Sequence, residues 1–195
     1  AEEALANAPN WQAGDVHCIF IEEDPERFMN LQQVLGNIPE NPRIQRQILF
    51  GTFVAGMEWL RQQQKSPFVK QEPMFAFIDP FGIKGLPFRV VEDILSRDGC
   101  EVLINLDSDG IGRVYSAGDS ANYRNLLNEV FGDGDWEREL GQVSRSSIGR
   151  SVLAMYRRRL RQIPAPYAFA FEMQSKLGKL DYHLVFATRH RRGLE

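Results

Sequence analysis

The chain has 195 residues, 43% of them hydrophobic and 25% charged, which is typical of a globular protein that folds as a single domain over residues 1–195. The net charge is −3, and no apolar run approaches the roughly 20 residues that cross a bilayer, so we expect no association with membranes. Cys18 and Cys100 are too few for a cysteine zinc site or a disulfide framework, and two free thiols predict a reducing, cytoplasmic location.

The first third of the chain alternates between strand and helix patterns. The apolar run 16–22 predicts a buried parallel strand. Asp24-Pro25 then predicts the capped start of a helix, which ends at Gly36. A second strand is expected over 47–53 and a second helix over 57–64.

The rest of the chain continues the alternation and closes with two strands. The predicted elements are strands over 73–79 and 101–106, a helix through 90–95, a long Gly-, Ser- and Asp-rich loop over 107–119, helices over 121–131 and 147–161, and a hairpin of strands 167–171 and 182–187 around Gly178.

The order of these elements predicts an α/β fold. Repeated strand–helix alternation implies a mostly parallel sheet with right-handed crossovers, and the final hairpin places one antiparallel strand in that sheet. This is the later part of a Rossmann-like three-layer sandwich of the class I methyltransferase type. Its first strand and glycine loop are missing, and residues 1–7 resemble the tail of a helix, so we expect an N-terminally truncated fragment.

Acidic residues stand at two of the predicted strand ends, where open α/β sheets bind their ligands. Glu22 suits a ribose, because its two carboxylate oxygens match the two hydroxyl donors of a cis-diol. Asp79-Pro80-Phe81 suits a flat group that bears an amine. The carboxylate and the proline carbonyl would accept hydrogen bonds from the amine, and the aromatic ring would stack on the flat group. The alternative is that Glu22 belongs to a helix start, while Asp79 caps a turn and Phe81 packs in the core.

Basic residues are candidates for phosphate contacts. Arg113 lies in the predicted long loop and Lys84 in the loop after the third strand, and each is either a substrate contact or an exposed surface charge. Residues 143–195 carry 11 basic and 3 acidic residues, whereas residues 1–142 carry 12 and 23. A basic third of this kind fits nucleic-acid binding, but the arginine run within 157–161 equally fits the solvated side of a helix.

Several segments match one family pattern in order and spacing. They are Phe20-Ile21-Glu22-Glu23-Asp24, Phe77-Ile78-Asp79-Pro80-Phe81-Gly82, Glu101-Val102-Leu103-Ile104-Asn105, Gly110-Ile111-Gly112-Arg113 and Tyr182-His183-Leu184-Val185-Phe186-Ala187-Thr188. From about residue 16 onward, the chain thereby resembles the three-Cys-motif partner family (TcmP), bacterial methyltransferase-like proteins named for a companion with three cysteines. The resemblance implies S-adenosylmethionine as cofactor, with Glu22 at its ribose. Thr52 and Phe53 would lie near its adenine, where family members tend to carry an acid.

The activity that we expect is methyl transfer to an amino group of nucleic acid. Asp79, Pro80 and Phe81 would form the acceptor pocket, and Arg113 and Lys84 would contact the substrate. The alternative is a fold without catalysis that binds the small three-Cys protein in mobile-element or phage-defence biology. A metal-dependent nuclease is a third hypothesis, but the acidic residues form no tight cluster in the sequence, and we predict no metal site.

Overall fold

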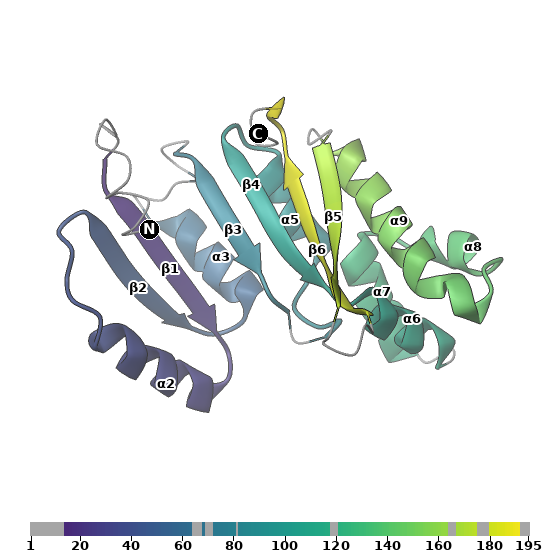
Figure 1. Ribbon diagram of the computed structural model, residues 1–195, viewed down its shortest axis with the longest axis horizontal. Helices are drawn as coiled ribbons and strands as arrows, with labels where there is room; N and C mark the ends of the chain where they lie inside the picture. Colours follow the sequence, from purple (N-terminus) through teal and green to yellow (C-terminus); the bar gives the residue numbers. More distant parts are fainter. Residues whose placement is uncertain are drawn as a thin grey trace. The chain divides into compact units, whose positions relative to one another are not determined.

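The structure is a computed structural model that describes residues 14–63, 68, 72–80, 82–117, 121–163, 167–174 and 180–191. The chain divides into two compact units, Ala1–Gln62 and Gln63–Glu195. Each unit has its own sheet: β1 and β2 pair in the first, and four strands in the order β3-β4-β6-β5 form the second (Figure 1). Among the described residues, no helix is both long and apolar enough to span a membrane.

The first unit is built from two parallel strands and two helices. Its elements are β1 (Val16–Glu22), α2 (Pro25–Gly36), β2 (Ile44–Phe50) and α3 (Phe53–Gln62). The start of α2 confirms the predicted cap, because the Asp24 side chain accepts a hydrogen bond from the N–H of Arg27. The second strand ends three residues earlier than predicted, at Phe50, and is followed by Gly51, whose φ of 144° suits glycine.

The two helices of this unit lie on opposite faces of its sheet. Phe28 of α2 packs edge-on against Phe50 of β2, with ring centroids 5.2 Å apart. On the other face, Gly56 of α3 lies directly against the side chain of Ile21 in β1. Because successive strand residues point to opposite faces, the alternation along β1 and β2 decides which helix each residue meets.

The second unit has a mixed sheet of four strands. They are β3 (Met74–Ile78), β4 (Cys100–Leu106), β5 (Tyr167–Gln174) and β6 (Leu180–Thr188). β3 and β4 pair in parallel, whereas β6 is antiparallel to both β4 and β5. The mixed α/β class and the closing antiparallel hairpin are therefore confirmed, while the turn with Gly178 lies outside the described residues.

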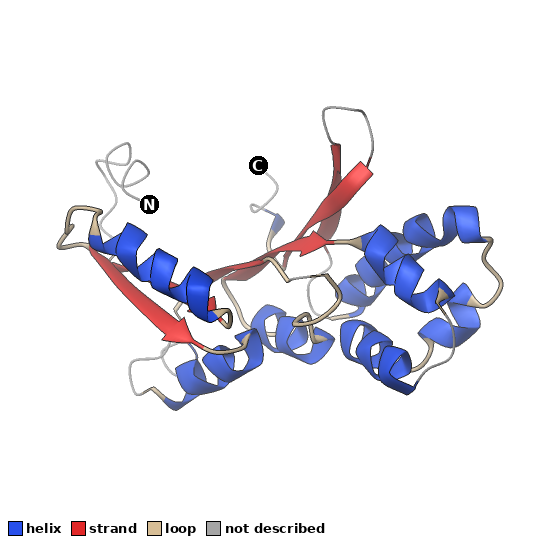
Figure 2. Ribbon diagram, turned by 90° about the horizontal axis from the view of Figure 1, so that it is seen from below, coloured by secondary structure: helices blue, strands red, loops and turns tan. Residues whose placement is uncertain are grey.

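Helices cover one face of this second sheet, and together they form the core (Figure 2). The helices are α5 (Phe88–Leu95), α6 (Ser108–Ser116), α7 (Ala121–Phe131), α8 (Trp136–Leu140) and α9 (Ile148–Gln162), with a 3₁₀ turn at Arg145–Ser147. α5 and α9 pack on the face that carries Val102, Ile104, Ala168, Val185 and Ala187, all of which are fully buried. The predicted helices 121–131 and 147–161 are confirmed to within one residue.

The structure corrects the predicted loop over 107–119. Residues Ser108–Ser116 form α6, and the Asp107 side chain caps this helix by accepting a hydrogen bond from the N–H of Gly110. Its glycines meet a packing need: a Cβ at Gly112 would lie only 2.7 Å from the Ile148 side chain. The small residues of this segment therefore allow close helix packing. Because glycines and serines are also typical of loops, composition alone predicted a loop here.

Candidate functional site

The carboxyl ends of β3 and β4 bring two polar side chains into contact. Asp79 directly follows β3, and Asn105 is the second-last residue of β4. The Nδ2 of Asn105 donates a hydrogen bond of 2.7 Å to Oδ1 of Asp79, whose residue is otherwise exposed to solvent. Because parallel strands end at the same edge of a sheet, this pair lies where α/β proteins bind ligands. Pro80 is half-buried beside it, and Phe81 lies outside the described residues.

Asn105 is the site residue that the sequence analysis missed. Its amide has one group bound to Asp79, but its Oδ1 is buried without a hydrogen-bond partner in the part of the chain that the structure describes. Donation from Nδ2 fixes the amide orientation, since the carbonyl oxygen would repel the carboxylate. The sequence did carry one signal for Asn105. It is a polar residue near the end of the predicted strand 101–106, and this strand is expected to lie beside the strand that ends at Asp79.

Arg113 lies near this edge but keeps most of its surface exposed. It sits in α6, where its guanidinium is 3.4 Å from Oδ2 of Asp107 and its side chain is 73% exposed. The other oxygen of Asp107 accepts the N–H of Gly110 at 2.6 Å, so Asp107 serves mainly as a helix cap. Arg113 is thus free to turn toward an anion at little cost.

Lys84 is exposed in the turn 82–85, where Gly82 and Gly85 adopt φ values of 70° and 83°. It forms no hydrogen bond or ion pair with the described residues. Arg113 and Lys84 are therefore both accessible to solvent. This exposure fits a substrate contact and an ordinary surface charge equally well.

A buried pair anchors the start of α6 to the sheet. Oγ of Ser108 lies 2.9 Å from Nδ1 of His183 on β6, and both residues are almost fully buried. Burial lowers the pKa of His183, while the negative charges of Glu172 and Asp109 act against this shift. The pair is closed to a substrate, so its role is to hold α6 in place below the candidate site.

In the first unit, Glu22 and Thr52 lie at one end of the β1–β2 sheet. Oε1 of Glu22 accepts the N–H of Asp24 at 2.9 Å, and the backbone oxygen of Glu22 accepts the N–H of Gly51 at 3.0 Å. Thr52 Oγ1 accepts the N–H of Ala55 at 3.2 Å and so caps α3, whose first residue is Phe53. Each of the two polar residues predicted to hold a cofactor already supports a helix start, and Glu22 keeps one carboxylate oxygen unengaged by the described residues.

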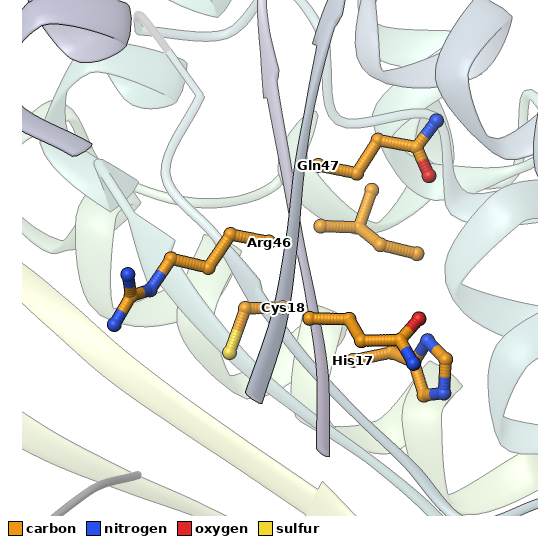
Figure 3. Close-up of a pocket in the computed structure, with 6 residues that line it drawn as sticks. His17, Cys18, Arg46 and Gln47 are labelled. Atoms are coloured by element: carbon orange, nitrogen blue, oxygen red, sulfur yellow. The ribbon is translucent and has the colours of Figure 1, made fainter. Parts of the chain in front are cut away.

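A hollow on the β1–β2 sheet is not a binding site for one ligand. It is lined by His17, Cys18, Ile19, Gln45, Arg46 and Gln47. His17 and Gln47 lie on one side of the two strands, and Cys18 and Arg46 lie on the other (Figure 3). A bound molecule could not contact both faces through the sheet.

The four arginines in the second half of α9 are engaged in contacts within the second unit. Arg157 and Arg161 both donate to the backbone oxygen of Ala168 on β5, at 3.2 and 3.1 Å. Arg158 pairs with Glu139, and Arg159 pairs with Asp133. Burial acts to raise the pKa of Asp133, but the hydrogen bonds from Arg159 and from the Asp135 N–H, together with the charge of Arg159, outweigh burial and hold that pKa below its usual value. The structure therefore favours a packing role for the arginine run over a phosphate-binding stripe.

Within the described residues, no group of three or more His, Cys, Asp or Glu side chains is placed to hold a metal ion. Comparisons with protein-family models, with curated proteins and with solved structures found no match to this chain.

Proposed function

We propose that this chain is a methyltransferase-like protein of the three-Cys-motif partner type, which uses S-adenosylmethionine to methylate an amino group of nucleic acid. The observation that carries the proposal is the exposed Asp79 carboxylate, held by Asn105 at the end of a parallel strand. The fold supports it, because β6 lies antiparallel between β4 and β5, as the methyltransferase type of Rossmann-like sandwich requires of its closing hairpin.

In this proposal, Asp79 orients the amine that is methylated. Asn105 occupies Oδ1, and Oδ2 has no hydrogen-bond partner among the described residues, so Oδ2 is available to accept an N–H of the target. The carbonyl of Pro80 would accept the second N–H, which leaves the nitrogen lone pair pointed at the incoming methyl group. Catalysis would come mainly from this positioning, which removes the entropic cost of aligning two reactants.

The residues of the first unit fit the cofactor in part. S-adenosylmethionine, when bound, supplies an electrophilic methyl group on its sulfonium. Glu22 would accept the ribose hydroxyls with its unengaged carboxylate oxygen, and Thr52 and Phe53 would lie near the adenine. Because Thr52 Oγ1 already accepts the N–H of Ala55, the Thr52 hydroxyl would contact the adenine mainly as a hydrogen-bond donor.

The first test is S-adenosylmethionine binding to this chain by calorimetry. Glu22→Gln keeps the oxygen that accepts the N–H of Asp24 but loses the charge, so we expect a loss of affinity of about tenfold or more. Glu23→Gln is the matched control, because Glu23 is exposed next to it, and it should bind as the parent does. Absence of binding, or an equal effect of both substitutions, would contradict the cofactor site.

The second test follows labelled methyl groups into single-stranded nucleic acid. Asp79→Asn should reduce transfer strongly while leaving cofactor affinity unchanged, because Asp79 would contact only the acceptor. A loss of cofactor affinity in Asp79→Asn would contradict this division of roles.

One observation favours the alternative, a non-catalytic protein that binds the three-Cys companion. Both polar residues assigned to the cofactor support helix starts, through the hydrogen bonds of Glu22 to Asp24 and of Thr52 to Ala55. A chain that binds no S-adenosylmethionine but forms a complex with a three-cysteine protein would support this second function.

A further inference from the structure

One face of the second sheet carries a large apolar surface that no described residue of this unit covers. Four phenylalanines on it are strongly exposed: Phe75 (59%), Phe77 (57%), Phe169 (38%) and Phe171 (58%). The first two lie on β3 and the others on β5, which are the two outer strands. The opposite face is the core beneath α5 and α9, so the sheet is apolar on both sides, and the described helices of this unit cover only one of them.

The strand register arranges this surface in three rows. The central row is Phe77, Leu103, Phe186 and Phe169, and it crosses all four strands. The row at the amino end of β3 is Phe75, Glu101, Thr188 and Tyr167, and the third row is Asn105, Leu184 and Phe171. We call these three rows the phenylalanine face.

The phenylalanine face carries almost no charge, and this excludes a partner with a charged surface. Glu101 is the one charged residue in the three rows, and it lies in an end row, where it can stay at a rim. A charged partner would bury its charges without counter-ions, which is costly. The surface that suits this face is equally apolar and uncharged.

The face is wider than a single helix can cover, and the opposite face of the same sheet is packed against both α5 and α9. Strands lie about 4.8 Å apart, whereas a helix with its side chains is about 10 Å across. One helix would therefore cover about two strands, but the exposed phenylalanines stand on both outer strands, β3 and β5. A second sheet packs face to face at about 10 Å and covers all four strands.

The exposed area is close to what a stable dimer needs. With about 200 Å² for each phenyl side chain, the four exposed rings contribute roughly 400 Å² per chain, which is within the range of the largest apolar patch on a typical monomer. Two copies would bury about 800 Å² through these rings alone. The half-buried Leu103, Leu184, Phe186 and Tyr167 bring the total to about 1,200 Å², the lower bound of a specific interface.

We propose that the phenylalanine face is the interface of a symmetric homodimer, in which two copies pack their four-stranded sheets against each other. A two-fold axis through the central row would place the same surface on both sides, as an isologous interface requires. Phe77 of one copy would then meet apolar rows of the other, and the Glu101 side chains would remain at the rim. The third row ends at Asn105, which the methyltransferase proposal also uses, but the inference rests on the four exposed phenylalanines and not on that proposal.

The test is the mass of this chain in solution, by multi-angle light scattering and sedimentation equilibrium. The parent should have twice the 22.3 kDa of one chain, and Phe77→Ser with Phe169→Ser should reduce the mass to a single chain. The matched control is Met29→Ser, an exposed apolar residue on α2, which should remain a dimer. Circular dichroism checks that each variant is folded, and Phe171→Ser is a milder second variant that should raise the dimer dissociation constant at least tenfold.

Several outcomes would overturn the proposal. The proposal is wrong if the parent protein is a monomer, or if it forms a series of ever larger assemblies instead of a closed dimer. A dimer that survives Phe77→Ser with Phe169→Ser must use another surface, such as the outer edge of β3. A monomer that binds a different polypeptide across the phenylalanine face would assign this face to that partner instead.

Discussion

Asn105 Nδ2 donates a hydrogen bond of 2.7 Å to Asp79 Oδ1, and this bond joins the ends of two neighbouring parallel strands. It holds one oxygen of the carboxylate and leaves the other directed to its surroundings. If Asp79 aligns a substrate amine, Asn105 is a positioning residue, because it acts on the substrate only through Asp79.

Replacing Asn105 by alanine should therefore lower methyl transfer by about ten- to a hundredfold, since small displacements of an aligned group cost that much. The cost to the free energy of unfolding should be only about 1 kcal/mol, because the bond is partly exposed. A double-mutant cycle of Asn105→Ala with Asp79→Asn measures the coupling. Asn122→Ala, an exposed asparagine on α7, is the control for nonspecific effects.

The two substitutions should be strongly non-additive in transfer rate, because each one removes the same interaction. Strict additivity would mean that Asn105 supports the fold without orienting Asp79.

The sequence predicted features that depend on local chemistry. Asp24 and Pro25 start α2 as expected, and Asp79 ends its strand region as expected, because capping and strand termination are decided by neighbouring residues. The contact of Asp79 with Asn105 was not predictable in the same way. It requires the register between β3 and β4, which local sequence does not decide for partners that are 26 positions apart.

The segment after β4 shows a different limit. Its Gly, Ser and Asp residues predicted a loop, yet three of them have specific contacts in or beside a helix. Asp107 caps α6, Ser108 lies in contact with His183, and the absence of a side chain at Gly112 makes room for Ile148. Two of these partners are more than 30 residues away. Tertiary packing therefore overrides local propensity here.

Basic residues should divide into two groups in nucleic-acid binding. Arg113→Gln and Lys84→Gln should each reduce the salt dependence of binding to a single-stranded oligonucleotide by about one phosphate contact, because both side chains are exposed. Arg157→Gln and Arg161→Gln should leave that dependence unchanged, since both guanidinium groups bind the Ala168 oxygen. These two should instead lower the free energy of unfolding, by about 1 kcal/mol each.

Fluorescence anisotropy over a range of KCl concentrations measures the salt dependence, and urea denaturation measures stability. An equal loss of salt dependence in both groups would show that α9 faces the phosphates after all.

Stability should fall in mild acid through His183. Burial holds the pKa of His183 in the folded protein below its ordinary value of 6.5, so the unfolded chain binds a proton that the folded protein does not. The contribution is fully present above pH 6.5 and is lost as the pH falls toward the folded-state pKa, by up to about 1.4 kcal/mol per pH unit. Urea denaturation between pH 8 and pH 5 measures it.

His183→Gln keeps a polar partner for Ser108 but does not titrate, so it should flatten this pH dependence. His190→Gln, at an exposed position after β6, is the matched control and should keep the parent slope. An unchanged slope in His183→Gln would assign the acid sensitivity to other groups.

Glycine is required at position 56 by the close packing of α3 on β1. A Cβ at this position would lie 2.5 Å from Cδ1 of Ile21, and within 3 Å of two further atoms of the same side chain. Gly56→Ala should therefore lower the free energy of unfolding by about 1–3 kcal/mol, despite the better helix propensity of alanine. Gly36→Ala, at the end of α2 with open space around its Cβ, should be neutral or slightly stabilising. Adding Ile21→Val to Gly56→Ala should restore part of the loss, and urea denaturation that finds no such rescue would contradict the contact.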